Sequence, residues 1–191
     1  MNIVLLGPPG AGKGTQSIKC QQRYQLTPIT PGDLLREHIK KGTELGKLAA
    51  SYLDAGKLAP HEIVMNVVEN QLIPPKGSQG FLFDGFPRAL AQAFSLDELL
   101  IIHGFKLDAV IFLEVPEQVI QQRIKERAKT SGRADDQDEA KIATRMQIYH
   151  QETLPLIKYY EKFGKLFRID GLGDIETVFG RIIAVLDRLR S

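Results

Sequence analysis

The chain has 191 residues, enough for one domain with a substantial apolar core. Its formal net charge is only +2 with both signs mixed along the sequence, so it lacks the long basic run that binds nucleic acid. The single cysteine, Cys20, excludes an internal disulfide. No apolar run is long enough to span a bilayer. Because a strand pattern begins at residue 3 and no signal peptide is expected before it, we expect a cytoplasmic protein.

Short apolar runs alternate with longer helical patterns, which indicates parallel strands joined by helical crossovers. We expect strands at Ile3–Leu6, Leu26–Ile29, Phe81–Asp84, Ala109–Val115 and Lys165–Ile169. We expect helices at 14–24, 33–41, 44–55, 61–72, 89–102, 117–128, 137–161 and 174–190. Pro155 predicts a kink or break near Leu154 in the long pattern. The predicted fold is α/β, with a doubly wound parallel sheet of five strands and helices on both faces.

The most informative motif follows the first strand, where residues 7–15 read GPPGAGKGT. Its glycines let the backbone wrap around an anion, the next helix adds the positive end of its dipole, and Lys13 supplies a cation. A strand, a glycine loop and a helix in this order indicate a P-loop for nucleotide phosphates. Gly14 stands where the common motif has a metal-binding hydroxyl, with Thr15 one residue later, so coordination of Mg²⁺ by a side chain of the loop is left open.

A second motif, FLFDGFPR at residues 81–88, ends an apolar strand in Asp84. Beside a P-loop, an aspartate at a strand end is typical of the residue that holds Mg²⁺. Gly85 and Pro87 turn the chain, and Arg88 offers a planar fork suited to phosphate oxygens. An Asp-Gly turn with a solvated arginine is the alternative.

Two segments depart from the strand–helix alternation. Residues 30–59 are purely helical between the second and third strands, and the polar residues 128–138 connect two helices. Such a connector is normally exposed, but one that carries Arg133 near a phosphate site can also act as a closing flap.

Four motifs occur together in a fixed order: GPPGAGKGT, PGDLLR at 31–36, DGFPR at 84–88 and GRADD at 132–136. In this combination the whole chain resembles the adenylate kinases, P-loop enzymes of the nucleoside monophosphate kinase family. The resemblance implies one domain, residues 1–191, in which 30–59 bind the monophosphate and 128–138 form a short lid. It implies a monomer that catalyses Mg-dependent, reversible transfer, ATP + AMP = 2 ADP, in adenine nucleotide homeostasis.

The resemblance also assigns residues to each nucleotide. ATP is expected at Gly10, Ala11, Gly12, Lys13, Gly14, Thr15, Arg123, Arg127 and Gly173. AMP is expected at Pro31, Arg36, Lys57, Leu58, Ala59, Gly85, Phe86, Pro87, Arg88, Gln92, Arg133 and Arg145. The implied catalytic set is Lys13, Arg88, Arg123, Arg127, Arg133 and Arg145. Cations suit this reaction because two polyanions must be brought together, and the protein contributes positioning and charge neutralisation.

Two acidic residues, Asp33 and Asp84, are expected to hold Mg²⁺ through its water shell. Asp33 also suits a helix N-cap. The lid segment is short and has no cysteine, so we expect no zinc. Gln92 is expected to read the adenine of AMP, although an exposed helical glutamine is the plainer interpretation.

One position departs from the family pattern. Adenylate kinases usually have threonine before Gly-Asp in the second motif, where it contacts the monophosphate base, and this chain has Pro31. A kinase of the same fold that prefers CMP or UMP is therefore the nearest rival. A nucleotide-dependent switch such as a GTPase is a rival of another class, but none of Asn2, Asn66 and Asn70 begins the guanine-reading motif N-K-x-D.

Overall fold

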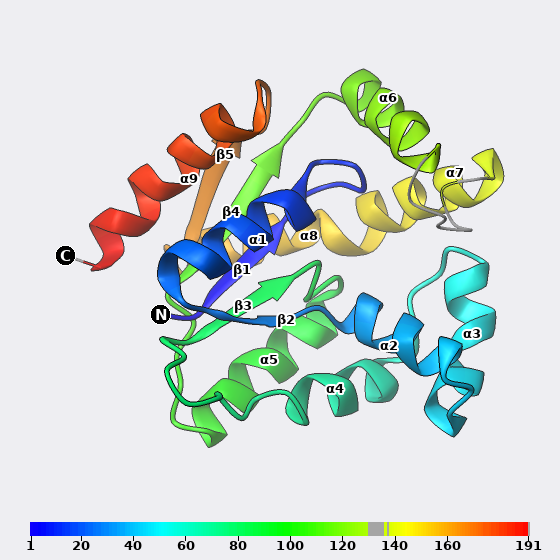
Figure 1. The fold of residues 1–191 in the computed structure, drawn as a ribbon, viewed down its shortest axis with the longest axis horizontal. Helices are drawn as coiled ribbons and strands as arrows, with labels where there is room; N and C mark the ends of the chain where they lie inside the picture. Colours follow the sequence, from blue (N-terminus) through cyan, green and yellow to red (C-terminus); the bar gives the residue numbers. More distant parts are fainter. Residues whose placement is uncertain (130–135, 137, 191) are drawn as a thin grey trace.

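A five-stranded sheet forms the centre of the computed structural model, which describes residues 1–129, 136 and 138–190 (Figure 1). The strands are β1 (Ile3–Leu6), β2 (Thr27–Ile29), β3 (Phe81–Asp84), β4 (Ala109–Glu114) and β5 (Leu166–Asp170). Their order is β2-β3-β1-β4-β5, and every neighbouring pair is parallel. The predicted doubly wound sheet is confirmed.

The central strand is β1, with Val4 beside Phe83 of β3 on one edge and Val110 of β4 on the other. All four residues of β1 are buried, as are the first five of β4. A parallel strand in the middle of a sheet is covered on both faces, which explains why these runs are continuously apolar. The loop after β1 therefore leaves from the best-packed strand of the molecule.

Helices cover both faces of this sheet. They are α1 (Lys13–Tyr24), α2 (Pro31–Lys40), α3 (Glu44–Asp54), α4 (His61–Glu69), α5 (Leu90–Ile102), α6 (Glu117–Ala128), α7 (Glu139–Ile148), α8 (Pro155–Lys162) and α9 (Ile175–Arg190). Ile3 and Leu5 pack in one core with α1 and α9, whereas Val4 and Leu6 pack in the other with α4, α5 and α8. Among the described helices none is long and apolar enough to cross a membrane.

The start of α2 differs from the expectation. The helix begins at Pro31, with Thr30 as its N-cap, so the alternative role of Asp33 as N-cap is wrong. Proline is favoured at the first position of a helix because its fixed φ is helical and its missing N–H would have no partner there. Asp33 lies in the first turn of α2, where its negative charge interacts favourably with the positive end of the helix dipole.

The long helical pattern at 137–161 is divided as Pro155 predicts. It forms α7, a π-helical turn at Tyr149–Thr153, and α8, which has Pro155 at its first position. In the π-helical turn the Leu154 N–H donates to the Tyr149 carbonyl oxygen, five residues back, at 2.8 Å. The predicted break is confirmed, and the π-helical turn was not predicted.

Candidate active site

A cavity of about 1210 Å³ lies at the carboxyl ends of the strands. Its wall is formed by the P-loop, the loops after β2, β3 and β5, and residues of α6 and α7. Because β1 has β3 on one side and β4 on the other, the chain order reverses at this place. A crevice at such a switch point is where open α/β sheets bind their ligands.

The P-loop requires glycine at position 10. This residue has φ +82, and a methyl group there would lie 2.9 Å from Cγ1 of Ile124 and 3.1 Å from the carbonyl oxygen of Ile120. Both neighbours belong to α6, so α6 packs directly against the loop. The glycine spacing of the motif therefore provides a conformation for an anion and also a close approach between two parts of the site.

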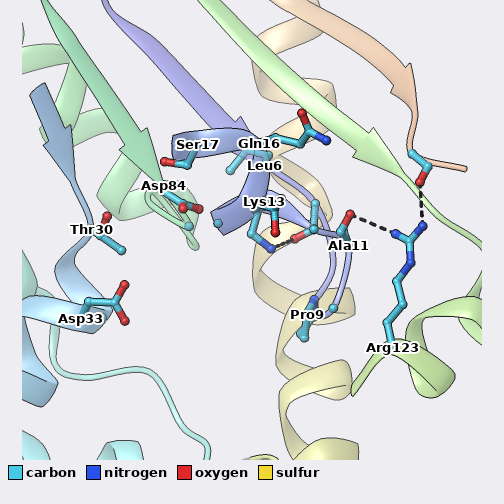
Figure 2. Close-up of a pocket in the computed structure, with 18 of the residues that line it drawn as sticks. Leu6, Pro9, Ala11, Lys13, Gln16, Ser17, Thr30, Asp33, Asp84 and Arg123 are labelled. Atoms are coloured by element: carbon cyan, nitrogen blue, oxygen red, sulfur yellow. Dashed lines mark hydrogen bonds between the residues drawn. The ribbon is translucent and has the colours of Figure 1, made fainter. Parts of the chain in front are cut away.

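Lys13 folds back on this loop. Its Nζ donates to the carbonyl oxygens of Gly7 and Pro8 at 2.8 and 2.9 Å (Figure 2). Burial lowers the pKa of Lys13 to about 7; Asp84 opposes this shift, and the positive charges of Arg88, Arg145 and Arg127 add to it. A nucleotide phosphate would stabilise the charged form of this lysine.

Asp84 lies at the end of β3, across the cavity from Arg123, with Thr30 and Asp33 on the same side (Figure 2). Burial raises the pKa of the Asp84 carboxyl, and the positive charge of Lys13 partly offsets this effect. A cation bound nearby would stabilise the ionised carboxylate.

Arg123 joins the P-loop to the loop after β5. Its Nη1 donates to the carbonyl oxygen of Ala11 at 3.3 Å, and its Nη2 donates to that of Gly171 at 3.1 Å (Figure 2). Gly173, which was also expected to bind ATP, lines the cavity two residues further on. The predicted donor-side residues are therefore brought together.

Arg127 of α6 and Arg145 of α7 both bind Asp136. The Nε and Nη2 of Arg127 each lie 2.7 Å from a carboxylate oxygen, and Nη1 of Arg145 lies 2.7 Å from Oδ1. The Asp136 side chain is fully buried. Burial alone would raise its pKa, but the hydrogen bonds from Arg127 and Arg145 outweigh burial and lower the pKa below its ordinary value.

The acceptor side is built around Arg88. Its Nε donates to the carbonyl oxygen of Gly85 at 2.6 Å, and its backbone N–H donates to Oε1 of Gln92 at 2.8 Å. Gly32 lies beside two guanidinium groups, since a methyl group there would be 3.4 Å from Nη2 of Arg36 and 3.7 Å from Nη2 of Arg88. Two arginines thus converge where the monophosphate is expected.

The loop after α3 also contacts α7. Gly56, in the loop after α3, has φ +70, and a methyl group there would lie 3.1 Å from the Lys141 carbonyl oxygen and 3.3 Å from Cγ of Arg145. In Figure 1 this loop faces α7. We call this contact the Gly56–α7 seam.

Most residues assigned from the sequence line the cavity. On the donor side these are Gly10, Ala11, Gly12, Lys13, Gly14, Thr15, Arg123, Arg127 and Gly173. On the acceptor side they are Asp33, Arg36, Lys57, Leu58, Asp84, Gly85, Pro87, Arg88 and Arg145. Four buried residues do not lie on its wall: Pro31, Ala59, Phe86 and Gln92. Arg133 and most of the predicted lid lie outside the described residues.

Among the cavity-lining residues that were not predicted are two threonines, Thr30 and Thr153. Thr30 is half-buried, and its side chain makes no capping hydrogen bond to α2, although it is the N-cap. Thr30 directly precedes Pro31, the position where the family pattern has threonine. This neighbouring hydroxyl was the sequence signal that could have predicted Thr30 as a site residue. No local pattern points to Thr153, which comes from the π-helical turn.

The fold and the site together define a P-loop nucleoside monophosphate kinase. The adenylate kinase family model matches residues 5–165. The chain is 45% identical over 189 residues to the adenylate kinase of Flavobacterium psychrophilum and 46% identical to that of Flavobacterium johnsoniae, covering 99% of this chain and 100% of each relative. It is 42% identical to the adenylate kinase of Archaeoglobus fulgidus, with both chains fully covered. The chain belongs to the adenylate kinase family, whose reaction is ATP + AMP = 2 ADP.

Proposed function

We propose that this enzyme transfers the γ-phosphoryl group of Mg-ATP, held at the P-loop, to AMP held between Arg36 and Arg88. The observation that carries the proposal is the convergence of cations. Arg88, Arg127 and Arg145 come from three separate elements, and the positive charge of each lowers the pKa of Lys13. Positive charges that disfavour one another are stabilised by a polyanion bound between them.

On the donor side, the backbone N–H groups of residues 10–15 bind the ATP phosphates, and Lys13 stabilises charge on the β- and γ-oxygens. Arg123 lies at the adenine end, and Arg127 reaches the phosphates from α6. On the acceptor side, Arg36 and Arg88 hold the monophosphate, whose oxygen attacks in line. No protein nucleophile is needed, so the protein contributes alignment and charge stabilisation.

Kinases of this family generally use Mg²⁺ with ATP. The residues present fit an ion that keeps its water shell: Asp84 and Asp33 are two carboxylates on one side of the cavity, and the described residues contain no cluster of three metal-ligating side chains. We propose that both carboxylates accept hydrogen bonds from metal-bound waters. When bound, Mg²⁺ neutralises charge on the β- and γ-oxygens. We also propose that the enzyme requires no zinc.

The roles of two further segments are proposed from the sequence assignment alone. Residues 30–59 and 128–138 close over the nucleotides, with Arg133 and Arg145 covering the transferring group. We further propose that the enzyme is a cytoplasmic monomer that takes small-molecule substrates and neither nucleic acid nor a membrane.

The direct test measures ADP formed from ATP with AMP, CMP, UMP or GMP as the acceptor, in the presence of Mg²⁺. We expect ADP production that depends on the acceptor and is fastest with AMP. Lys40→Met, at an exposed position on α2, serves as the matched control for Lys13→Met. Turnover of ATP that is independent of any monophosphate would contradict the proposal, and faster turnover with CMP or UMP would favour the pyrimidine alternative.

A further inference from the structure

Thr153 is a buried hydroxyl residue at the end of the π-helical turn, with 8% of its surface exposed. Its Oγ1 donates a hydrogen bond to the backbone carbonyl oxygen of Arg88 at 2.8 Å. The two residues are 65 positions apart in the chain. This bond therefore joins the loop after β3 to the helical segment between α7 and α8.

Side chains from two different helical segments hydrogen-bond the backbone N–H and the carbonyl oxygen of Arg88. Gln92 of α5 accepts from the N–H, and Thr153 donates to the carbonyl oxygen. The side chain itself is held by its Nε bond to the Gly85 carbonyl. Because the allowed rotamers of a side chain depend on its backbone, these bonds together constrain where the Arg88 guanidinium points.

The π-helical turn explains how Thr153 reaches Arg88. A π turn contains one residue more than an α-helical turn, so it changes the direction of the side chains that follow, and such turns are frequent at functional sites. The turn continues directly from α7, which carries Arg145. The segment from α7 to Thr153 thus carries two residues of the site: Arg145, which binds Asp136, and Thr153, which binds the backbone of Arg88.

We propose that Thr153 is a positioning residue for the acceptor phosphate: its bond to the Arg88 carbonyl fixes the Arg88 guanidinium relative to Arg145. This inference rests on the proposed function, in which Arg88 binds AMP. Thr153 acts through Arg88, and its own hydroxyl is already committed to the Arg88 carbonyl.

The test compares Thr153→Val, which keeps the shape and removes the hydroxyl, with Thr153→Ser, which keeps the hydroxyl. Loss of one such bond corresponds to about a 3- to 10-fold effect. We expect Thr153→Val to raise KM for AMP by that factor and to leave KM for ATP within about 2-fold, while Thr153→Ser stays near wild type. Thr144→Val is the matched control, since Thr144 Oγ1 also donates to a backbone carbonyl, that of Ala140, at 2.8 Å within α7.

A second measurement separates positioning from stability. In an Arg88→Met background, adding Thr153→Val should not weaken AMP binding further by calorimetry, because the group that Thr153 positions is gone. If Thr153→Val does not fold, Thr153→Ala replaces it in both comparisons. An unchanged KM for AMP, or equal changes for AMP and ATP, would overturn the proposal. If the wild-type enzyme itself shows no acceptor-dependent ADP formation, the proposed function fails instead.

Discussion

Arg127 and Asp136 form a bidentate ion pair, with two N–O distances of 2.7 Å to a carboxylate that is fully buried. Arg145 adds a third bond from α7. Asp136 thus places one buried carboxylate between two guanidinium groups that come from different helices.

We expect Asp136→Asn to lower Tm at pH 7 by about 4–8 °C, since it removes the negative charge that accepts hydrogen bonds from two guanidinium groups, a loss of roughly 2 kcal/mol. The pKa of Asp136 is below its ordinary 3.8, so its stabilising effect is present above pH 3.8 and is lost as pH falls through the lower value in the folded protein. The Tm difference from wild type should therefore shrink at pH 3. Asp54→Asn, at an exposed position, is the control; equal effects of both variants would contradict the prediction.

Lys13→Met should lower kcat by on the order of 10²-fold or more, the scale for removing one key electrostatic group. The reason is that Lys13 stabilises charge on the β- and γ-phosphates during transfer. The measurement is steady-state turnover of purified, folded variant beside Lys40→Met. Near-normal turnover would contradict the assignment of the P-loop.

The same substitution should have a pH-dependent effect on stability. The pKa of Lys13 is about 7 in the folded protein and ordinarily 10.5, so between these values the unfolded chain binds more protons and the contribution of Lys13 becomes less destabilising as pH rises. Below pH 7 the buried charge is present in full. We therefore expect Lys13→Met to melt above wild type at pH 6, and this difference to shrink towards pH 10. A constant difference across this range would rule out titration of Lys13 as its cause.

Acceptor choice should show a clear but finite preference for AMP, with CMP second. Adenine and cytosine both present an amino group beside a ring nitrogen, so the Gln92 amide alone does not reject CMP. The preference for AMP then comes from the larger purine, which fills the pocket better, and a difference of this kind changes kcat/KM by about 10–200-fold. Gln92→Leu should reduce kcat/KM for AMP, and more than a lost base contact would, because Gln92 also accepts from the Arg88 N–H.

The Thr30 and Pro31 positions give a separate comparison. Pro31 is buried, whereas Thr30 is on the cavity wall. Thr30→Val should lower kcat/KM for AMP by about 2- to 10-fold, and Pro31→Thr should raise it modestly. If Thr30→Val has no effect while Pro31→Thr has a large one, the hydroxyl belongs at position 31 as in the rest of the family pattern.

The sheet and the P-loop could be predicted because their signals are local. The apolar runs Ile3–Leu6 and Ala109–Glu114 differ little from their sequence-based bounds, since burial on both faces requires apolar residues at every position. The start of α2 was missed because Pro31, which was considered for base contact, also determines where that helix begins.

Other contacts of the site depend on tertiary structure. The sequence predicts that Gln92 lies on a helix. It does not predict that the amide oxygen of Gln92 accepts a hydrogen bond, because this depends on the position of the Arg88 N–H. Asp136 lies nine residues from both Arg127 and Arg145, and only the tertiary placement of α6 and α7 brings the three together. The π-helical turn that presents Thr153 lies within a pattern that predicts one continuous helix up to the break at Pro155, so no local signal points to it.

The Gly56–α7 seam has a consequence for the pace of the catalytic cycle. Gly56 rests against Lys141 and Arg145, so the opening and closing proposed for residues 30–59 would break and restore this contact. We expect each turnover to include this separation and return. Product departure, rather than the transfer step, can thus set the upper limit of the rate.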